Sequence, residues 1–380
     1  MSTALKRLDL QPYLKREPVM LALLMGLAIV LFAAVAGLSR LYYRQQEALA
    51  ERWSVRGADD LNAGRFSAAV VDFRTSLLYS RDNYEYQLKL AEALVGENRT
   101  DEAYGYLRNL WDRQPENGFV NLELARIDAS RGQTENALRY YHNAIYAIWP
   151  AGQNTERRKT NLELIHYLLR IGDTAQADSE LIALAANLGN NPAERTRAGQ
   201  LFLQAQDSQR AREQFRLALQ GNRHDVAAMA GAGNAAFQLG RYSEAERYLR
   251  DAAEAGNHSV EPQLKMAELV LNLDPFRPVL KAADRDRIVM HGFAAAGSRL
   301  QACAAPGSFS VPADELTKFD QAWTKLKPRI TERNLRRNPD LVNSAMSLVF
   351  SIERETSGMC GGMSDTDNAL LLIANQHEGL

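Results

Sequence analysis

Two patterns of apolar residues divide this chain. Residues 19–38 form an unbroken apolar run, VMLALLMGLAIVLFAAVAGL, without a charged or strongly polar side chain. From about residue 50 onward, small and large apolar residues instead recur among polar ones, and proline is sparse. Both patterns favour helix, so the chain is predicted to be all-α.

The apolar run predicts a transmembrane helix. At about 1.5 Å per residue its twenty positions span roughly 30 Å, the thickness of the hydrocarbon core of a bilayer. Charged residues bound it on both sides and two tyrosines follow at interface depth: Lys15, Arg16, Glu17, Arg40, Arg44, Tyr42 and Tyr43. A cleavable signal peptide is the alternative, because Ala34-Val35-Ala36 fits a cleavage site, but the tripeptide lies inside the run. We therefore expect residues 19–40 to be an uncleaved single-pass anchor behind a tail of residues 1–18.

The orientation of this anchor does not follow from charge. Four basic residues precede the run and four follow it closely: Lys6, Arg7, Lys15 and Arg16, then Arg40, Arg44, Arg52 and Arg56. The positive-inside rule therefore favours neither orientation. A short tail before a large C-terminal part resembles signal-anchored proteins, which export that part. We expect a location in the inner or cytoplasmic membrane, with the soluble part outside the cytoplasm.

Small and large apolar residues recur every 34 positions in two runs. The small member is an alanine in six places: Ala69, Ala103, Ala137, Ala177, Ala211 and Ala245. Four residues later stands a bulky residue: Phe73, Leu107, Tyr141, Leu181, Phe215 and Leu249. In the first three units a residue that favours a turn stands five positions before the alanine: Gly64, Asn98 and Gly132. A second small residue stands seven positions before that turn: Gly57, Ala91 and Ala125. Small residues at fixed places let two helices approach closely, and the large residue fills the gap toward the next pair.

The period is interrupted once. Ala177 follows Ala137 by 40 residues instead of 34, so six extra residues lie between the third and fourth units, near residues 149–156. The sixth unit carries the pattern most completely, as Gly233, Leu239-Gly240-Arg241-Tyr242-Ser243-Glu244-Ala245, Leu249 and Ala252.

Over about residues 50–258 these units resemble the tetratricopeptide repeat (TPR) family. The first unit adds Trp53, Gly57, Gly64, Phe66, Ala69 and Phe73, and the second ends at Pro115. Two positions depart from the family pattern: Ile165 stands where a small residue is usual, and Gln206 stands at the fifth turn. The resemblance implies a right-handed TPR-type solenoid of six repeats across residues 41–258. With the apolar run and the helical pattern that follows the repeats, the expected fold is all-α, with an N-terminal transmembrane helix and a C-terminal helical cap.

Residues 259–380 leave the period but stay helical in pattern. Helices are predicted at 262–273, 285–302, 312–326, 340–353 and 368–375. Capping signals precede the last two: Asn338 before Pro339, and Ser364 with Asp367 three residues later. Because a solenoid needs a terminal element with a polar outer face, we expect this region to be a capping domain.

The two cysteines, Cys303 and Cys360, both fall in this region. If the domain is exported, a disulfide between them would close a loop of 58 residues and contribute about 4 kcal/mol in the chain-entropy account. Two unrelated buried thiols are the alternative. The sequence leaves both open.

Signatures of catalysis are missing from the sequence. The segment from Gly231 through Gly233 to Ala236 matches G-x-G-x-x-A, but it has no preceding strand and repeat packing accounts for it. The six histidines are scattered without metal-ligand spacing, and there is neither a Walker loop nor a serine elbow. We expect no enzyme activity, no catalytic residues, no cofactor and no metal.

The resemblance implies instead a groove lined by the first helix of each unit. One inward register position is filled by Ala58, Glu92, Arg126, His166, Gln200 and Asn234, with Arg170 and Phe237 among the neighbouring positions. A positive centre with amide donors suits a protein partner, in particular an acidic or extended peptide. The family's carboxylate clamp of Lys and Asn is not reproduced. A solvated inner face without a partner is the alternative.

A second surface competes with this groove. Residues 318–337 include seven basic side chains and only two acidic ones. The basic residues are Lys318, Lys325, Lys327, Arg329, Arg333, Arg336 and Arg337, and the acidic ones are Asp320 and Glu332. Charge runs are usually solvated faces, and the net charge of −1 gives no general attraction to nucleic acid. We expect a membrane-anchored scaffold or assembly factor of the cell envelope. An enzyme or a lipid- or nucleic-acid-contacting module in residues 259–380, with the repeats as its docking arm, is the alternative.

Overall fold

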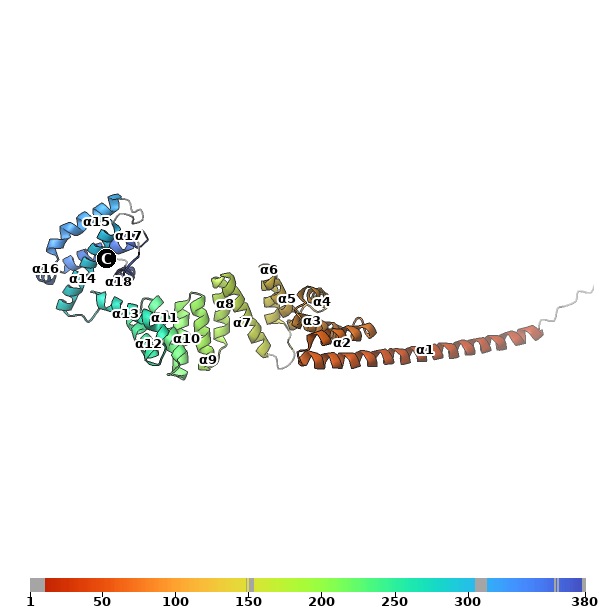
Figure 1. Ribbon diagram of the computed structural model, residues 1–380. Coiled ribbons are helices and arrows are strands. Elements are labelled where there is room, and N and C mark those ends of the chain that lie inside the picture. Colours follow the sequence, from red (N-terminus) through yellow and green to blue (C-terminus); the bar gives the residue numbers. More distant parts are fainter. Residues whose placement is uncertain are drawn as a thin grey trace, which may run out of the picture. The chain divides into compact units, whose positions relative to one another are not determined.

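The computed structural model describes residues 11–147, 149, 154–304, 313–358, 360 and 362–377, and every regular element among them is a helix (Figure 1). Most of the expected N-terminal tail, residue 148, residues 150–153 of the expected insertion, and the loop before Ala313 lie outside the described residues. The chain divides into two compact units, residues 1–164 and 165–380.

The first unit contains the following helices: α1 (Gln11–Asn62), α2 (Phe66–Tyr79), α3 (Tyr84–Gly96), α4 (Thr100–Arg113), α5 (Gly118–Ser130) and α6 (Thr134–Tyr146). Helix α7 (Asn154–Ile171) crosses the division. The second unit continues with α8 (Thr174–Ala186), α9 (Pro192–Gln204), α10 (Ser208–Gly221), α11 (Val226–Gln238), α12 (Tyr242–Glu254), α13 (Glu261–Leu273), α14 (Ala282–Cys303), α15 (Ala313–Leu326), α16 (Glu332–Arg337), α17 (Pro339–Ser357) and α18 (Asp365–Gln376). Short 3-10 turns occupy His258–Val260 and Lys327–Arg329.

Helix α1 joins the apolar run to the first repeat without a break. It is 52 residues long, so the boundary expected at residue 40 is not a boundary in the backbone. The large apolar side chains from Met20 to Leu38 are 56–78% exposed, so the described part of the chain leaves them largely uncovered. Only the last part of α1 packs against α2, as Figure 1 shows.

The repeat packing follows the small and large positions seen in the sequence. The six alanines of the period are fully buried, and so are their bulky partners four residues later. Within the first, fifth and sixth units, a Cβ added to Gly57, Gly199 or Gly233 would lie 3.1 Å, 2.8 Å or 2.6 Å from the bulky side chain of the same unit. These glycines therefore set how closely the two helices of a unit approach.

The turn between the two helices of a unit needs a residue with the left-handed backbone conformation, in which φ is positive. Glycine supplies it in four units, and non-glycine residues supply it in the other two: Asn98 (φ 62°) and Gln206 (φ 66°). Asparagine tolerates this conformation, whereas for glutamine it costs about 1–2 kcal/mol. The departure at the fifth turn is thus a point of local backbone strain, and the other departure, Ile165, is fully buried.

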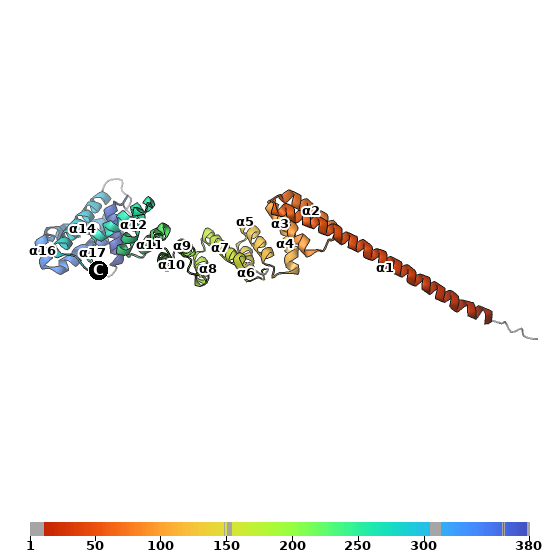
Figure 2. The same cartoon turned by 90° about the horizontal axis from the view of Figure 1, so that it is seen from below.

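The C-terminal helices share one hydrophobic core with the last repeat. Tyr242 of α12 and Val270 of α13 belong to the same buried cluster as Phe293 of α14 and Phe350 of α17. Helix α18 packs against α13, and the Gln376 amide donates a hydrogen bond to the carbonyl of Gly240. Figure 2 shows α14 and α17 side by side. This core therefore includes residues on both sides of residue 258, after which the sequence predicts the capping domain.

The helices predicted after the repeats are present, and their caps follow the sequence signals. The Asn338 side chain accepts a hydrogen bond from the backbone N–H of Asp340, and Ser364 and Asp367 form a reciprocal capping box at α18. The sequence pattern missed the short helix α16.

Candidate partner-binding face of the repeats

Two first helices of the repeats in the second unit, α9 and α11, lie next to each other. Helix α9 contacts α11 directly, in addition to its own partner α10. This arrangement gives the first helices a common face, on which residues 34 positions apart stand in the same place.

Amide side chains occupy this face. Gln200 and Gln204 of α9 are exposed, and Gln238 of α11 is exposed and accepts a hydrogen bond from the Ser208 hydroxyl. Asn234 is half-buried, and its amide oxygen has no hydrogen-bond partner among the described residues. The face therefore offers both donors and acceptors to a ligand.

Phe237 has a different role from the one expected for it. Its ring stands edge-on to Tyr242, with the centroids 5.2 Å apart, and it packs against two buried clusters of the second unit. Phe237 thus contributes mainly to the core between α11 and α12.

His166 and Arg170 lie exposed on α7. They are four residues apart and therefore share a helix face. The Arg170 guanidinium lies over the ring of Tyr167, 5.4 Å from its centroid, which holds the arginine while leaving its charge open to solvent.

Arg126 is engaged within the first unit. Its guanidinium donates two hydrogen bonds to Glu163, of 2.8 and 2.7 Å, and one of 2.6 Å to Glu123. The Tyr141 hydroxyl donates to the same Glu163 carboxylate at 3.0 Å. The hydrogen bond from Arg126 to Glu163 raises the pKa of the guanidinium still further, and burial raises the pKa of Glu123.

Because of this pairing, Arg126 has no free positive charge with which to attract the acidic ligand that the sequence predicted. One arginine between two carboxylates carries no surplus positive charge, and its forked donors are already used. Arg126 also belongs to the first compact unit, whereas the other five expected groove residues belong to the second. The spacing of Glu123 and Arg126 on one helix was visible in the sequence, but the partnership with Glu163 crosses the insertion and was not.

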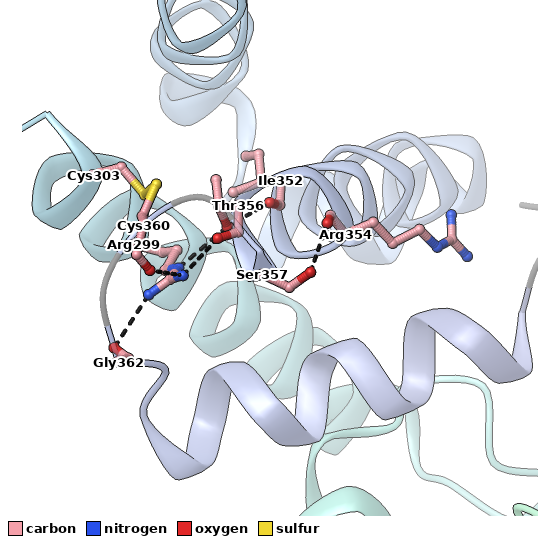
Figure 3. Close-up of a disulfide and its surroundings, with 8 residues drawn as sticks. All are labelled: Arg299, Cys303, Ile352, Arg354, Thr356, Ser357, Cys360 and Gly362. Carbon is pink, nitrogen blue, oxygen red and sulfur yellow. Dashed lines mark hydrogen bonds between the residues drawn. A yellow bond between two sulfur atoms is a disulfide. The ribbon is translucent and has the colours of Figure 1, made fainter. Parts of the chain in front are cut away.

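A disulfide joins Cys303 at the end of α14 to Cys360, with the Cα atoms 5.1 Å apart. Beside it, the buried Arg299 guanidinium donates to the carbonyls of Thr356 and Cys360, both at 2.7 Å, and to that of Gly362 at 3.3 Å. Figure 3 shows the arginine pointing into this ring of carbonyl groups. The cross-link and the arginine together hold Cys360 and Gly362 against the end of α14.

Two further properties bear on function. Among the described residues, one helix is long and apolar enough to cross a membrane, Met20–Asn62, with a mean hydropathy of 2.7 in its most apolar window; a signal sequence meets the same criterion. No group of three or more His, Cys, Asp or Glu side chains within the described part of the chain could hold a metal ion.

Paired helices with a 34-residue period, a left-handed turn inside each pair and neighbouring first helices define the architecture. The fold is a TPR-type helical solenoid. No protein-family model matches this chain, and no curated protein matches it.

Solved TPR structures resemble the chain at low scores. YrrB, a TPR protein with an unusual peptide-binding site, has a TM-score of 0.41 and 13% identity, covering 51% of this chain and 97% of its own. The C-terminal part of a TPR protein from Cytophaga hutchinsonii has a TM-score of 0.44 and 13% identity, covering 62% and 92%. PilF of Pseudomonas aeruginosa has a TM-score of 0.31 and 18% identity, covering 63% and 96%. At these scores the fold assignment rests on the helices of this chain.

Proposed function

We propose that this TPR chain is a membrane-anchored scaffold of the cell envelope, which binds a protein partner along the first helices of its repeats. The observation that carries the proposal is the polar register on these helices: His166 and Gln200 are exposed, and Asn234, at the equivalent place, is half-buried. A buried structural helix would not keep such side chains at the surface. The ligand that fits is an extended peptide, whose backbone the amides can pair and whose carboxylates Arg170 can attract.

The apolar part of α1 supports the anchor. The exposed apolar side chains from Met20 to Leu38 would destabilise the protein in water, because each CH₂ removed from water contributes about 0.8 kcal/mol. The hydrocarbon core of a bilayer covers an apolar segment of this length from end to end.

The disulfide supports a location of the soluble part outside the cytoplasm. Disulfides persist in oxidising compartments and are rare where glutathione and thioredoxin keep thiols reduced. This compartment can be tested by maleimide labelling in spheroplasts. An impermeant reagent that labels Cys303 and Cys360 only after reduction is the expected result, whereas labelling by a permeant reagent alone, without reduction, would place the domain in the cytosol.

The C-terminal region fits the role of a cap better than that of a separate enzyme. Helices α14, α17 and α18 bury their apolar faces in a core shared with α12 and α13. They therefore cover the end of the repeats, which a solenoid requires for solubility.

A pair of photo-crosslinking residues tests the binding face. One replaces Gln204 on the shared face of the first helices, and the control replaces Gln220, which is exposed on α10, the second helix of the same unit. Adducts of one defined protein at Gln204 and not at Gln220 are expected in intact cells. Adducts at Gln220 alone, or equal adducts at both, would refute binding along the first helices.

A further inference from the structure

The end of α2 lies near the place where α1 would leave a bilayer. Helix α2 runs antiparallel to the last part of α1, which brings its end back toward the apolar run. The Ser76 hydroxyl donates a 2.8 Å hydrogen bond to the carbonyl of Ala50, and one turn earlier Asp72 pairs with Arg56 at 3.1 Å. These two contacts fix the register of α2 along α1.

This register gives the height of α2 above the apolar run. Ala50 lies twelve residues after Leu38, or about 18 Å along a continuous helix. Helix α2 continues past Ser76 to Tyr79, so the turn that follows it lies roughly 12 Å from the end of the apolar run. The polar headgroup layer accounts for about 5–7 Å on each side of the hydrocarbon core. A long side chain reaches across the remaining distance.

The end of α2 and the turn after it form the edge of the first repeat that would face the bilayer. The side chains at this edge suit a membrane surface. Leu78 is 71% exposed, and Arg81 in the turn after α2 is exposed, without an ion pair among the described residues. Acidic residues also lie near this level, Glu47 on α1 and Asp82 in the turn. The edge is therefore not strongly basic, and its position carries the argument more than its charge.

The part of α1 just below this edge has the composition of an interface. Tyr42 and Tyr43 are 60% and 64% exposed, and Arg40 and Arg44 are exposed on either side of them. Tyrosine and arginine are favoured at headgroup depth, where one end of the side chain is apolar and the other wet.

We propose that the turn after α2 rests on the phospholipid headgroup layer, with Arg81 at lipid phosphates and the end of α2, including Leu78, just above that layer. This proposal rests on the membrane anchor proposed above. The first repeat then contacts the membrane at two places, along α1 and at the end of α2, and its distance from the bilayer is fixed.

Single-cysteine labelling of the full chain in phospholipid vesicles tests this contact. Because both native cysteines are in the disulfide, an added cysteine is the only free thiol. Three variants carry the environment-sensitive dye NBD: Phe32→Cys in the apolar run, Leu78→Cys at the edge, and Ala63→Cys at the far end of the α1–α2 hairpin. Phosphatidylcholine with a nitroxide on its headgroup or on its acyl chain quenches the dye at matching depth.

The expected result is loss of fluorescence at Phe32→Cys with the acyl-chain nitroxide, and at Leu78→Cys with the headgroup nitroxide, with no loss at Ala63→Cys. Adding Arg81→Glu should reduce the loss at Leu78→Cys, and an unchanged loss would refute the arginine contact. If Phe32→Cys is quenched and Leu78→Cys behaves like Ala63→Cys, the edge proposal is wrong and the anchor stands. If Phe32→Cys is not quenched, the anchor fails and the edge contact fails with it.

Discussion

Replacing Glu353 with glutamine should abolish a pH dependence of stability that this residue imposes. Glu353 lies on α17 with none of its surface exposed, and neither carboxylate oxygen has a hydrogen-bond partner among the described residues. Burial raises its pKa from 4.5 to about 8; the Asp367 carboxylate raises it too, while the Arg299 guanidinium lowers it. The folded protein therefore keeps a proton that the unfolded chain loses near pH 4.5.

The sign and size of the effect follow from proton linkage. Between pH 4.5 and 8 the folded state binds more protons at this site than the unfolded state, so the free energy of unfolding falls as pH rises. Each pH unit well inside this window costs about 1.4 kcal/mol, and the loss between pH 6 and 8 is about 2 kcal/mol once partial ionisation near pH 8 is included. Glutamine is uncharged at both pH values and has no such dependence.

Urea unfolding of the oxidised full chain at pH 6 and pH 8, followed by circular dichroism, measures this difference. The advantage of Glu353→Gln over the natural protein should grow by about 2 kcal/mol from pH 6 to pH 8. Any constant cost of burying the amide cancels in this comparison. Glu355→Gln is the matched control, because Glu355 is exposed two residues further along α17, and it should show no such growth. A constant difference between Glu353→Gln and the natural protein would refute the reasoning.

Three further substitutions test the packing and the cross-link by the same unfolding measurement. Cys303→Ser should lower the free energy of unfolding by about 4 kcal/mol, since the two cysteines are separated by 57 positions in the sequence. A loss below about 1 kcal/mol would contradict the cross-link's role. Gly231→Ala places a methyl group 2.2 Å from the ring of Phe215 and should cost about 1–3 kcal/mol despite the better helix propensity of alanine; the cost should shrink in a Phe215→Leu background. Gln206→Gly should raise stability by about 1 kcal/mol by relieving its left-handed backbone, and a decrease would show that the turn is unstrained.

The sequence predicted those features of the site that depend on local spacing. Register positions 34 residues apart placed Gln200 and Asn234 on equivalent helices, and the structure keeps the first exposed and the second half-exposed. Phe237 shared that register, but its ring finds a neighbour, Tyr242, in the second helix of the unit. Periodicity gives the place of a residue on its helix but not which neighbouring side chain covers it.

Charge was the least predictable property of the candidate face. Arg126 appeared as a free cation because its bidentate partner, Glu163, lies 37 residues away and beyond the insertion. An ion pair between helices depends on distances of a few ångströms, and these follow from the crossing of the helices rather than from their sequence period.

By itself, the sequence determined the helices, their pairing, the turns and the apolar run, because each depends on contacts between residues that are close in the chain or repeat at a fixed period. The tertiary structure alone decided that α18 returns to α13, that Arg299 closes a ring of carbonyl groups beside a disulfide, and that Glu353 is buried without a hydrogen-bond partner among the described residues. Those features join segments separated by many residues, and their free energies depend on burial and geometry that no local pattern encodes.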